Sequence, residues 1–327
     1  MAWYTISGRN VSWSVGIVNA TDFEHFAYPD YPSEPSWFTV LPFLEDISFN
    51  LPAGVEPVTL LGYAHPPGFP PVTIPVQQFT INFFLQQADP FGVADAFIQN
   101  SLWERWNEQQ GRYFQTVCLP FTFVFLIKDV ALGASTVLVV PYAFISRLSF
   151  RNDTTTGAVR ISTTFTTPFL QLFSNPNFSL ITNYDVDAPV VLTREIVTHD
   201  FGERQAFLLD LTINNRFELV YPTRTSNQPT RYIRTAPRWL YLGSSIEANV
   251  SVIHPFVTSD EFETLFSVSP TDLTFYIRTR YNDSSFKQRK MTLHQFRISS
   301  VGHRYSFNEM VADEIRGVCR FVSWGEG

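Results

Sequence analysis

The stretch VTIPVQQFTINFFLQQADPFGVADAFIQNSLWERW, residues 72–106, contains the signals on which the fold prediction rests. From Val72 to Phe83 apolar residues alternate with others, which predicts a strand with one buried face. Asp89 and Pro90 suit the start of a helix. Apolar residues at helical spacing then predict a helix over about 90–109; they are Phe91, Ala94, Ile98, Leu102 and Trp106.

Strand patterns follow this helix at residues 121–127, 137–150 and 158–165, separated by turn-forming residues. A similar order returns near the C-terminus. A strand pattern at 246–257 precedes Thr258 and Glu261, which are spaced as a capping box and predict a short helix over about 259–267. Further strand patterns then occupy 273–281, 291–299 and 314–324.

The two halves also match residue by residue in places. Phe121-Thr122-Phe123 is followed 152 residues later by Leu273-Thr274-Phe275, and Phe144 is followed by Phe296 at the same separation. We interpret these matches as an internal duplication. The alternative is that any two β-domains rich in Phe and Thr would show them. The expected core of the two domains includes Phe123, Phe144, Phe275 and Phe296.

These patterns predict a mainly β protein with two tandem β-sandwich domains, each flanked by one helix. We expect the first domain over 51–173 and the second over 189–327, with a turn-rich linker over 174–188. Residues 1–50 are rich in aromatic residues and proline, so we expect an extended arm there.

The composition suggests a surface that neighbouring molecules cover. Charged residues make up 16% of the chain, and there are three lysines against twenty arginines. Lysine is depleted where proteins contact each other, whereas arginine and aromatic residues are enriched. A compositional bias of the host is the alternative. Four arginines in the expected loop 222–238 are candidate contacts between subunits: Arg224, Arg231, Arg234 and Arg238.

The charge and the apolar pattern exclude several classes of protein. A net charge of −7 argues against a general nucleic-acid binder, although it suits a surface along which DNA passes without binding. No apolar run reaches the roughly 18 residues that a membrane span needs. The first ten residues do not have the pattern of a secretory signal.

The sequence offers no catalytic, cofactor or metal motif. No two histidines have zinc-ligand spacing, and Cys118 and Cys319 stand apart from them. Asp185 and Asp187 lack further oxygen ligands at the spacing of a calcium site. Nothing selects acid pairs such as Glu195 and Asp200 as the carboxylates of a glycosidase, and no phosphate-binding glycine loop occurs. We therefore expect no enzyme activity, cofactor, metal or small-molecule substrate.

Several segments resemble the tail tube proteins of long-tailed bacteriophages. They are Gln78–Phe84 before the helix, the aromatics Phe97, Trp103 and Trp106, and the closing strands Pro141–Ser146 and Val159–Phe165. The resemblance implies tube-type β-sandwich domains in a ring of the tail tube, the baseplate or a hub at the tail end. Such a ring encloses a channel for DNA.

The resemblance also implies the partners and the location. They are further copies of the chain in a trimeric or hexameric ring, other tail proteins of the virion, and passing DNA that is not specifically bound. The protein would be assembled in the host cytoplasm and reside in the virion tail. Two alternatives stay open. One is another virion protein, such as a capsid or decoration jelly roll; the other is a carbohydrate-binding β-sandwich of a tail fibre, with Trp3, Tyr4 and Trp13 against sugar rings.

Overall fold

The computed structural model describes residues 11–18, 38–40, 44–50, 77–85, 92–102, 104–107, 110, 112–115, 121–129, 134–154, 157–167, 171–174, 192–198, 204–220, 238–253, 271–280, 286–304 and 312–326. These residues form a mainly β structure with one short helix, α1 (Gly92–Ser101). The strands are β1 (Val11–Val18), β2 (Phe38–Val40), β3 (Leu44–Asn50), β4 (Gln77–Phe84), β5 (Glu104–Asn107), β6 (Arg112–Gln115), β7 (Phe121–Asp129), β8 (Ala134–Asp153), β9 (Val159–Thr167), β10 (Gln171–Ser174), β11 (Leu192–Thr198), β12 (Arg204–Val220), β13 (Arg238–Ile253), β14 (Thr271–Arg280), β15 (Phe286–Arg304), β16 (Ala312–Cys319) and β17 (Phe321–Glu326).

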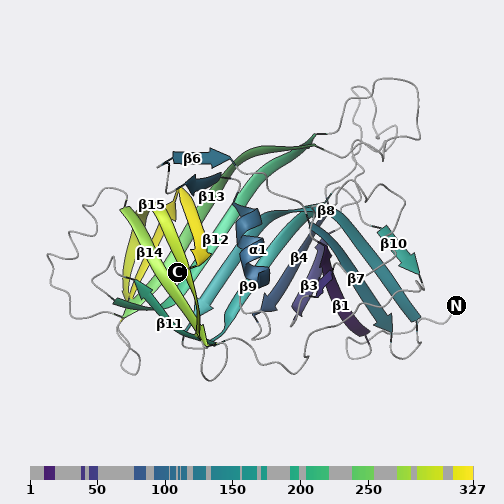
Figure 1. Ribbon diagram of the computed structural model, residues 1–327, viewed down its shortest axis with the longest axis horizontal. Coiled ribbons are helices and arrows are strands. Elements are labelled where there is room, and N and C mark those ends of the chain that lie inside the picture. The colour runs from purple at the N-terminus through teal and green to yellow at the C-terminus, as the bar shows by residue number, and fades with distance from the viewer. Residues whose placement is uncertain are drawn as a thin grey trace, which may run out of the picture.

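Fifteen of these strands belong to one continuous antiparallel sheet, and β5 pairs with β6 in a separate hairpin (Figure 1). The sheet runs β11-β14-β15-β16-β13-β12-β8-β7-β1-β2, with further strands paired to the sides of this path. Because β11 also pairs with β12, six strands of the C-terminal half close into a cylinder.

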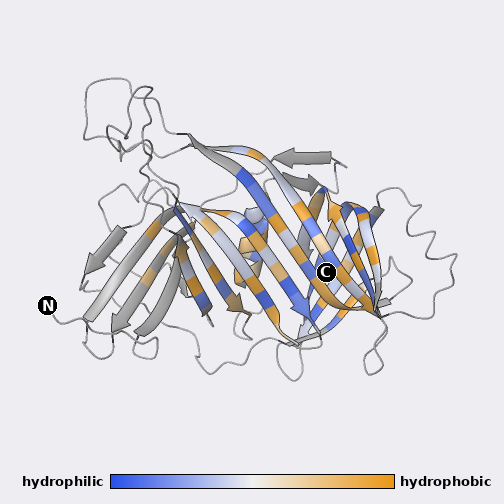
Figure 2. Cartoon of the chain, turned by 180° about the vertical axis from the view of Figure 1, so that it is seen from behind, coloured by the Kyte–Doolittle hydropathy of each residue, from blue (hydrophilic) through white to orange (hydrophobic). Residues whose placement is uncertain are grey.

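The core follows from the alternation that the sequence shows. Along β4, Phe79, Ile81 and Phe83 are buried, and the residues between them are partly exposed. The same alternation appears as bands of opposite hydropathy along the strands in Figure 2. Phe97 on α1 is fully buried and packs edge-on against Phe83, 5.7 Å between ring centroids. The helix therefore covers one face of the first half of the sheet.

The expected helix is shorter than the apolar spacing predicts. It ends at Ser101, whose hydroxyl donates to the carbonyl of Ile98, and Trp106 lies in strand β5 instead. The segment 104–107 pairs with β6, where Trp106 lies opposite Tyr113. Helical spacing alone could not exclude this outcome, because it does not account for a competing hairpin with residues a few positions further on.

The strand pairing of the N-terminal half returns in the C-terminal half. We call Val11–Ser174 the first unit and Leu192–Glu326 the second unit. In the first unit β4 pairs with β3 and β9, and β8 pairs with β7, β9 and β10. In the second, β13 pairs with β12 and β16, and β15 pairs with β14, β16 and β17. β1 pairs with β7 as β11 pairs with β14.

Three register shifts also recur at equivalent places. Each adds one residue on one strand of a pair, so it marks a position along both strands. In the first unit they lie at Leu44/Asp46, Phe121/Phe123 and Ile145/Arg147. In the second unit they lie at Ala206/Leu208, Thr271/Leu273 and Ile298/Ser300. A single alignment of the two units superposes all three.

This alignment corrects one expected core residue. Phe123, Phe275 and Phe296 are buried, whereas Phe144 is only partly buried. Phe144 shares the spacing of Leu148 and Phe150, but the shift at Ile145/Arg147 reverses which residues of β8 face the core. The residue equivalent to Phe296 is Ala143, one position before Phe144.

Parts of the expected N-terminal arm are strands of the sheet. All eight residues of β1 pair with β7, β2 pairs with β1, and β3 pairs with β4. The expected linker begins at Ser174, the last residue of β10, and its remaining residues lie outside the described part of the chain. So does the expected helix at 259–267.

Candidate assembly interface

The two units meet through a strand ladder inside the sheet. The C-terminal part of β8 pairs with β12, from Arg147 opposite Asn214 to Asp153 opposite Leu208. This part of β8 therefore lies between β9 of its own unit and β12 of the next unit. The two expected domains share one sheet, and their division into 51–173 and 189–327 stays a prediction.

The inner face of this junction is a closed apolar layer. Two β8 residues, Leu148 and Phe150, and three β12 residues, Leu209, Leu211 and Ile213, are 0% exposed. Burying one such side chain contributes about 1.5–3 kcal/mol. The junction is therefore part of the hydrophobic core, and separating β8 from β12 would expose these side chains to water.

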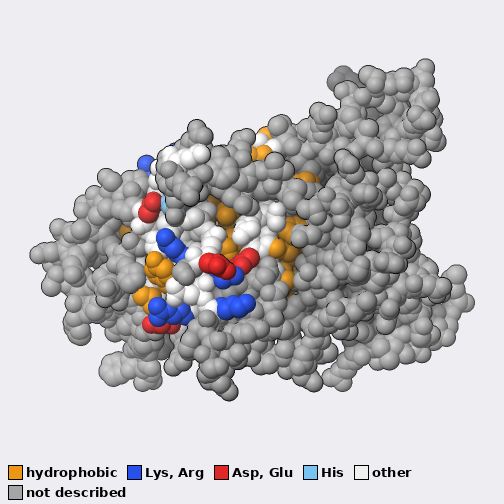
Figure 3. Space-filling view, viewed as in Figure 1, with side chains coloured by type: hydrophobic (Ala, Val, Ile, Leu, Met, Phe, Trp, Pro, Cys, Tyr) orange, Lys and Arg blue, Asp and Glu red, His pale blue; other side chains and the backbone are white. Residues whose placement is uncertain are grey.

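The outer face of the junction carries charged groups. Asp210 lies opposite Arg151 in the ladder. Burial raises the pKa of Asp210, while the positive charges of Arg151 and Arg147 and a hydrogen bond from Ser149 oppose that rise. Figure 3 shows the opposite face, on which α1 lies, and acidic and basic side chains of the described residues also lie side by side there.

Asn215 connects three elements at the junction. Its buried Nδ2 donates to the carbonyl of Ser101 at 2.8 Å, at the end of α1, and to the carbonyl of Ile145 at 3.0 Å, in β8. Ile145 lies at the register shift of β8, where the regular ladder is interrupted. One side chain of β12 therefore serves two backbone acceptors of the first unit.

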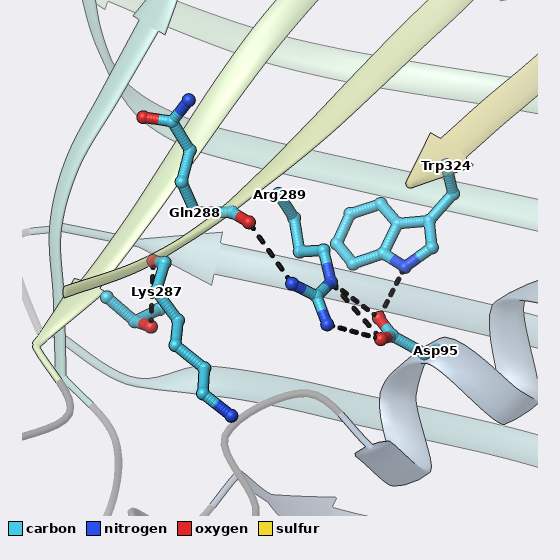
Figure 4. Close-up of polar contacts among 6 residues, drawn as sticks. Asp95, Lys287, Gln288, Arg289 and Trp324 are labelled. Carbon is cyan, nitrogen blue, oxygen red and sulfur yellow. Dashed lines mark hydrogen bonds and ion pairs between the residues drawn. The ribbon is translucent and has the colours of Figure 1, made fainter. Parts of the chain in front are cut away.

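A second polar contact links α1 to the second unit (Figure 4). Arg289 of β15 donates to both oxygens of Asp95 on α1, with Nη2 2.7 Å from Oδ2 and Nε 3.1 Å from Oδ1. Trp324 of β17 donates its Nε1 to the same carboxylate at 2.6 Å. The hydrogen bond with Asp95 raises the pKa of Arg289. The helix is thus tied to two strands of the other unit.

The structure also assembles a serine, a histidine and an aspartate. His294 Nδ1 lies 2.8 Å from Asp272 Oδ2, and His294 Nε2 lies 3.1 Å from Ser323 Oγ. This is the connectivity of a catalytic triad. The group also has a structural role, because Asp272 accepts from the backbone N–H of Gln295, a non-glycine residue at φ 52. In the first unit Pro141 occupies the position of His294.

Most of the other predicted site residues fall outside the part of the chain that the structure describes. Arg224, Arg231 and Arg234 are outside the described residues, and Arg238 opens β13 opposite Val220. Glu195 pairs with Arg278 at 3.1 Å, whereas Asp185, Asp187 and Asp200 are outside the described part. No local pattern in the sequence marks Asn215, Arg289 or His294, because their partners are distant along the chain.

The described residues contain no group of three His, Cys, Asp or Glu side chains that could hold a metal ion. Within the same part of the chain, no helix is long and apolar enough to cross a membrane. Comparison with models of known protein families gives no match, and no curated protein matches the chain.

Proposed function

We propose that this chain is a structural subunit of a ring in a bacteriophage tail tube, baseplate or tail-end hub. Its two units would be two copies of one tube-type β-sandwich domain that arose by duplication. The repeated pairing and the three repeated register shifts support the duplication, because unrelated sheets have no reason to share them.

The observation that carries the proposal is the ladder between β8 and β12. It joins one unit to the next by two different surfaces, so the contact is head to tail. Head-to-tail contacts repeated with a constant rotation close into rings or continue as filaments. A chain that already contains one such step is suited to build the rest from further copies of itself.

The charge suits a channel for DNA. At −7 the chain carries a net charge of the same sign as the phosphate backbone, so a wall made of it would repel DNA and let it slide. The ring needs no catalytic group for this task. Its partners are other copies of the chain and neighbouring tail proteins of the virion.

Negative-stain microscopy of the purified full chain tests the proposal. We expect rings, or tubes of stacked rings, each with a central hole. A particle that stays monomeric at every protein concentration, both alone and with its virion partners, contradicts the assignment.

Hydrolysis is the second candidate function, because Ser323, His294 and Asp272 have the contacts of a triad. Against it, Ser323 lies within the ladder of β17 and β15, where backbone N–H groups serve strand pairing. A fluorophosphonate probe separates the two functions. We expect no labelling; labelling of the intact chain that disappears in Ser323→Ala would favour a hydrolase.

A further inference from the structure

We propose that strand β3 of one chain pairs with the C-terminal end of β15, residues 302–304, in a second chain, in the way β12 pairs with β8 inside each chain. This inference rests on the proposed function and specifies its interface. The occupant of each edge is a second copy of this chain.

The first argument is that, among the described strands, β3 and the C-terminal part of β15 each pair on one side only, whereas their equivalents, β12 and the C-terminal part of β8, pair on both sides. Residues 147–153 of β8 have β9 on one side and β12 on the other. The equivalent part of β15 pairs with β16, and no other described strand pairs with it. Likewise β12 lies between β13 and β8, whereas β3 pairs with β4 alone among the described strands. The chain thus presents both halves of the contact that it makes internally.

The second argument is burial. On β12, Leu209 and Leu211 are fully buried by the junction, while their equivalents on β3, Ile47 and Phe49, are only partly buried. The same difference separates β8 from β15, because Leu148 is fully buried and its equivalent Val301 is partly buried. The edge side chains that lack full cover are Ile47, Phe49 and Val301. Pairing the two edges would complete their burial.

The repeated register shifts fix the expected register. Asp46 corresponds to Leu208, so Ser48 corresponds to Asp210. Ser300 corresponds to Arg147, so Arg304 corresponds to Arg151. Since Asp210 lies opposite Arg151, we infer three pairs between chains. These pairs are Ser48 with Arg304, Phe49 with His303, and Asn50 with Gly302.

The charges at these edges are complementary. Arg304 takes the place that Arg151 holds at the internal junction. Asp46 is exposed on β3, two residues from Ser48, where it accepts a hydrogen bond from Asn82. Residues at i and j±2 on paired strands are diagonal neighbours within reach of long side chains. The acidic residue Asp46 would therefore lie diagonally across the ladder from the basic residue Arg304 of the next chain.

Disulfide trapping of the full chain tests the register. The variants Ser48→Cys/Arg304→Cys and Asn50→Cys/Gly302→Cys place thiols opposite each other between chains. Residue 302 tolerates a side chain, because an added Cβ would meet its nearest atom at 3.9 Å. Burial raises the pKa of Cys319 to about 12, which keeps this thiol protonated and unreactive at mild pH. Single-cysteine variants control for Cys118.

We expect mild oxidation to give dimers and larger species on non-reducing gels, and a reductant to abolish them. Ser48→Cys/Ser300→Cys is out of register and should give none. Asp210→Cys/Arg151→Cys is the internal equivalent and should form its bond within one chain. The pairing is overturned if the in-register variants do not cross-link above the out-of-register variant while the internal pair does.

Microscopy of the same samples separates this inference from the proposed function. Rings without register-specific cross-links would overturn the β3–β15 pairing and leave the ring proposal standing. Register-specific cross-links in open strings of molecules would confirm the pairing and overturn the ring.

Discussion

Gly317 shows how a single residue adapts to the strand beside it. A Cβ at this position would collide with the ring of Phe296 and with the carbonyl oxygen of Arg297. The equivalent positions in the first unit are exchanged in size, since Phe165 stands in place of Gly317 and Ala143 in place of Phe296. Each unit therefore keeps one large and one small residue at this point of its core.

We expect Gly317→Ala to lower the free energy of unfolding by about 1–3 kcal/mol, because the backbone carbonyl of Arg297 cannot move aside without breaking the ladder. Urea unfolding measures the change. Gly325→Ala is the matched control, since nothing lies within 4 Å of its added Cβ. Equal stability of the two variants would contradict the close approach at Gly317.

Asp210 makes stability depend on pH at the junction. Its pKa in the folded chain is raised above the ordinary value of 3.8 by burial, so the folded state holds the proton more tightly than the unfolded state. The contribution of this carboxyl to stability therefore falls as pH rises between the unfolded and folded pKa values. Above both pKa values the charged carboxylate of Asp210 lowers the free energy of unfolding.

We expect Asp210→Asn to raise the thermal midpoint at pH 7 and to have no effect well below pH 3.8, where Asp210 is protonated in both states. Thermal unfolding at both pH values measures the difference. A lower midpoint for the variant at pH 7 would mean that the attraction of Arg151 and Arg147 outweighs the burial of the carboxylate.

Among the elements, α1 holds the two units together through Asp95. Arg289 and Asp95 are largely buried, with side-chain exposures of 13% and 23%. Removing the arginine would leave the carboxylate with Trp324 as a neutral partner. The cost lies between that of an exposed pair and that of a fully buried one.

We expect Arg289→Met to lower the free energy of unfolding by about 2 kcal/mol. Asp95→Asn keeps an acceptor for Trp324, so a double-mutant cycle with it isolates the ion pair. The matched control is Arg278→Met, whose pair with Glu195 is 48% and 36% exposed and should contribute at most about 1 kcal/mol. Equal losses for the two arginines would remove the special role of Asp95.

The sequence predicted elements well where the signal is local. Period-two alternation correctly indicated strands at 121–127, 137–150 and 158–165, and the capped apolar stripe indicated α1. The length of the helix was wrong, because helical spacing of apolar residues does not account for the competing hairpin in which Trp106 lies opposite Tyr113. The core position of Phe144 was wrong because a register shift depends on the partner strand, which local periodicity does not encode.

For the whole molecule, the N-terminal segment belongs to the sheet. β1 pairs along residues 122–129 of β7, so it covers an edge that would otherwise be open. We expect a chain lacking residues 1–36 to have a lower thermal midpoint and to aggregate. Deleting residues 1–10 removes no described strand and serves as the control. Calorimetry and light scattering check both; an unchanged midpoint in the longer deletion would show that β1 is dispensable.

The junction between the two units could not be predicted from the sequence. Matches such as Phe121-Thr122-Phe123 with Leu273-Thr274-Phe275 indicated a repeat, but strand pairing shifts this alignment by two residues. The ladder between β8 and β12 depends on how two distant strands meet in the folded chain, so no local sequence pattern predicts it. The phenylalanine-rich composition is reflected in the core, where Phe79, Phe123 and Phe165 are fully buried. The covered surface inferred from the low lysine content stays a prediction.

Because β8 and β12 belong to the same polypeptide, the two units that they join cannot dissociate, and this has a mechanical consequence. If chains assemble through β3 and β15, every second contact around the particle is held by the polypeptide itself, and the others are held by noncovalent forces alone. Dilution or pulling would open the particle at alternate contacts first, and the fragments released would always contain an even number of units.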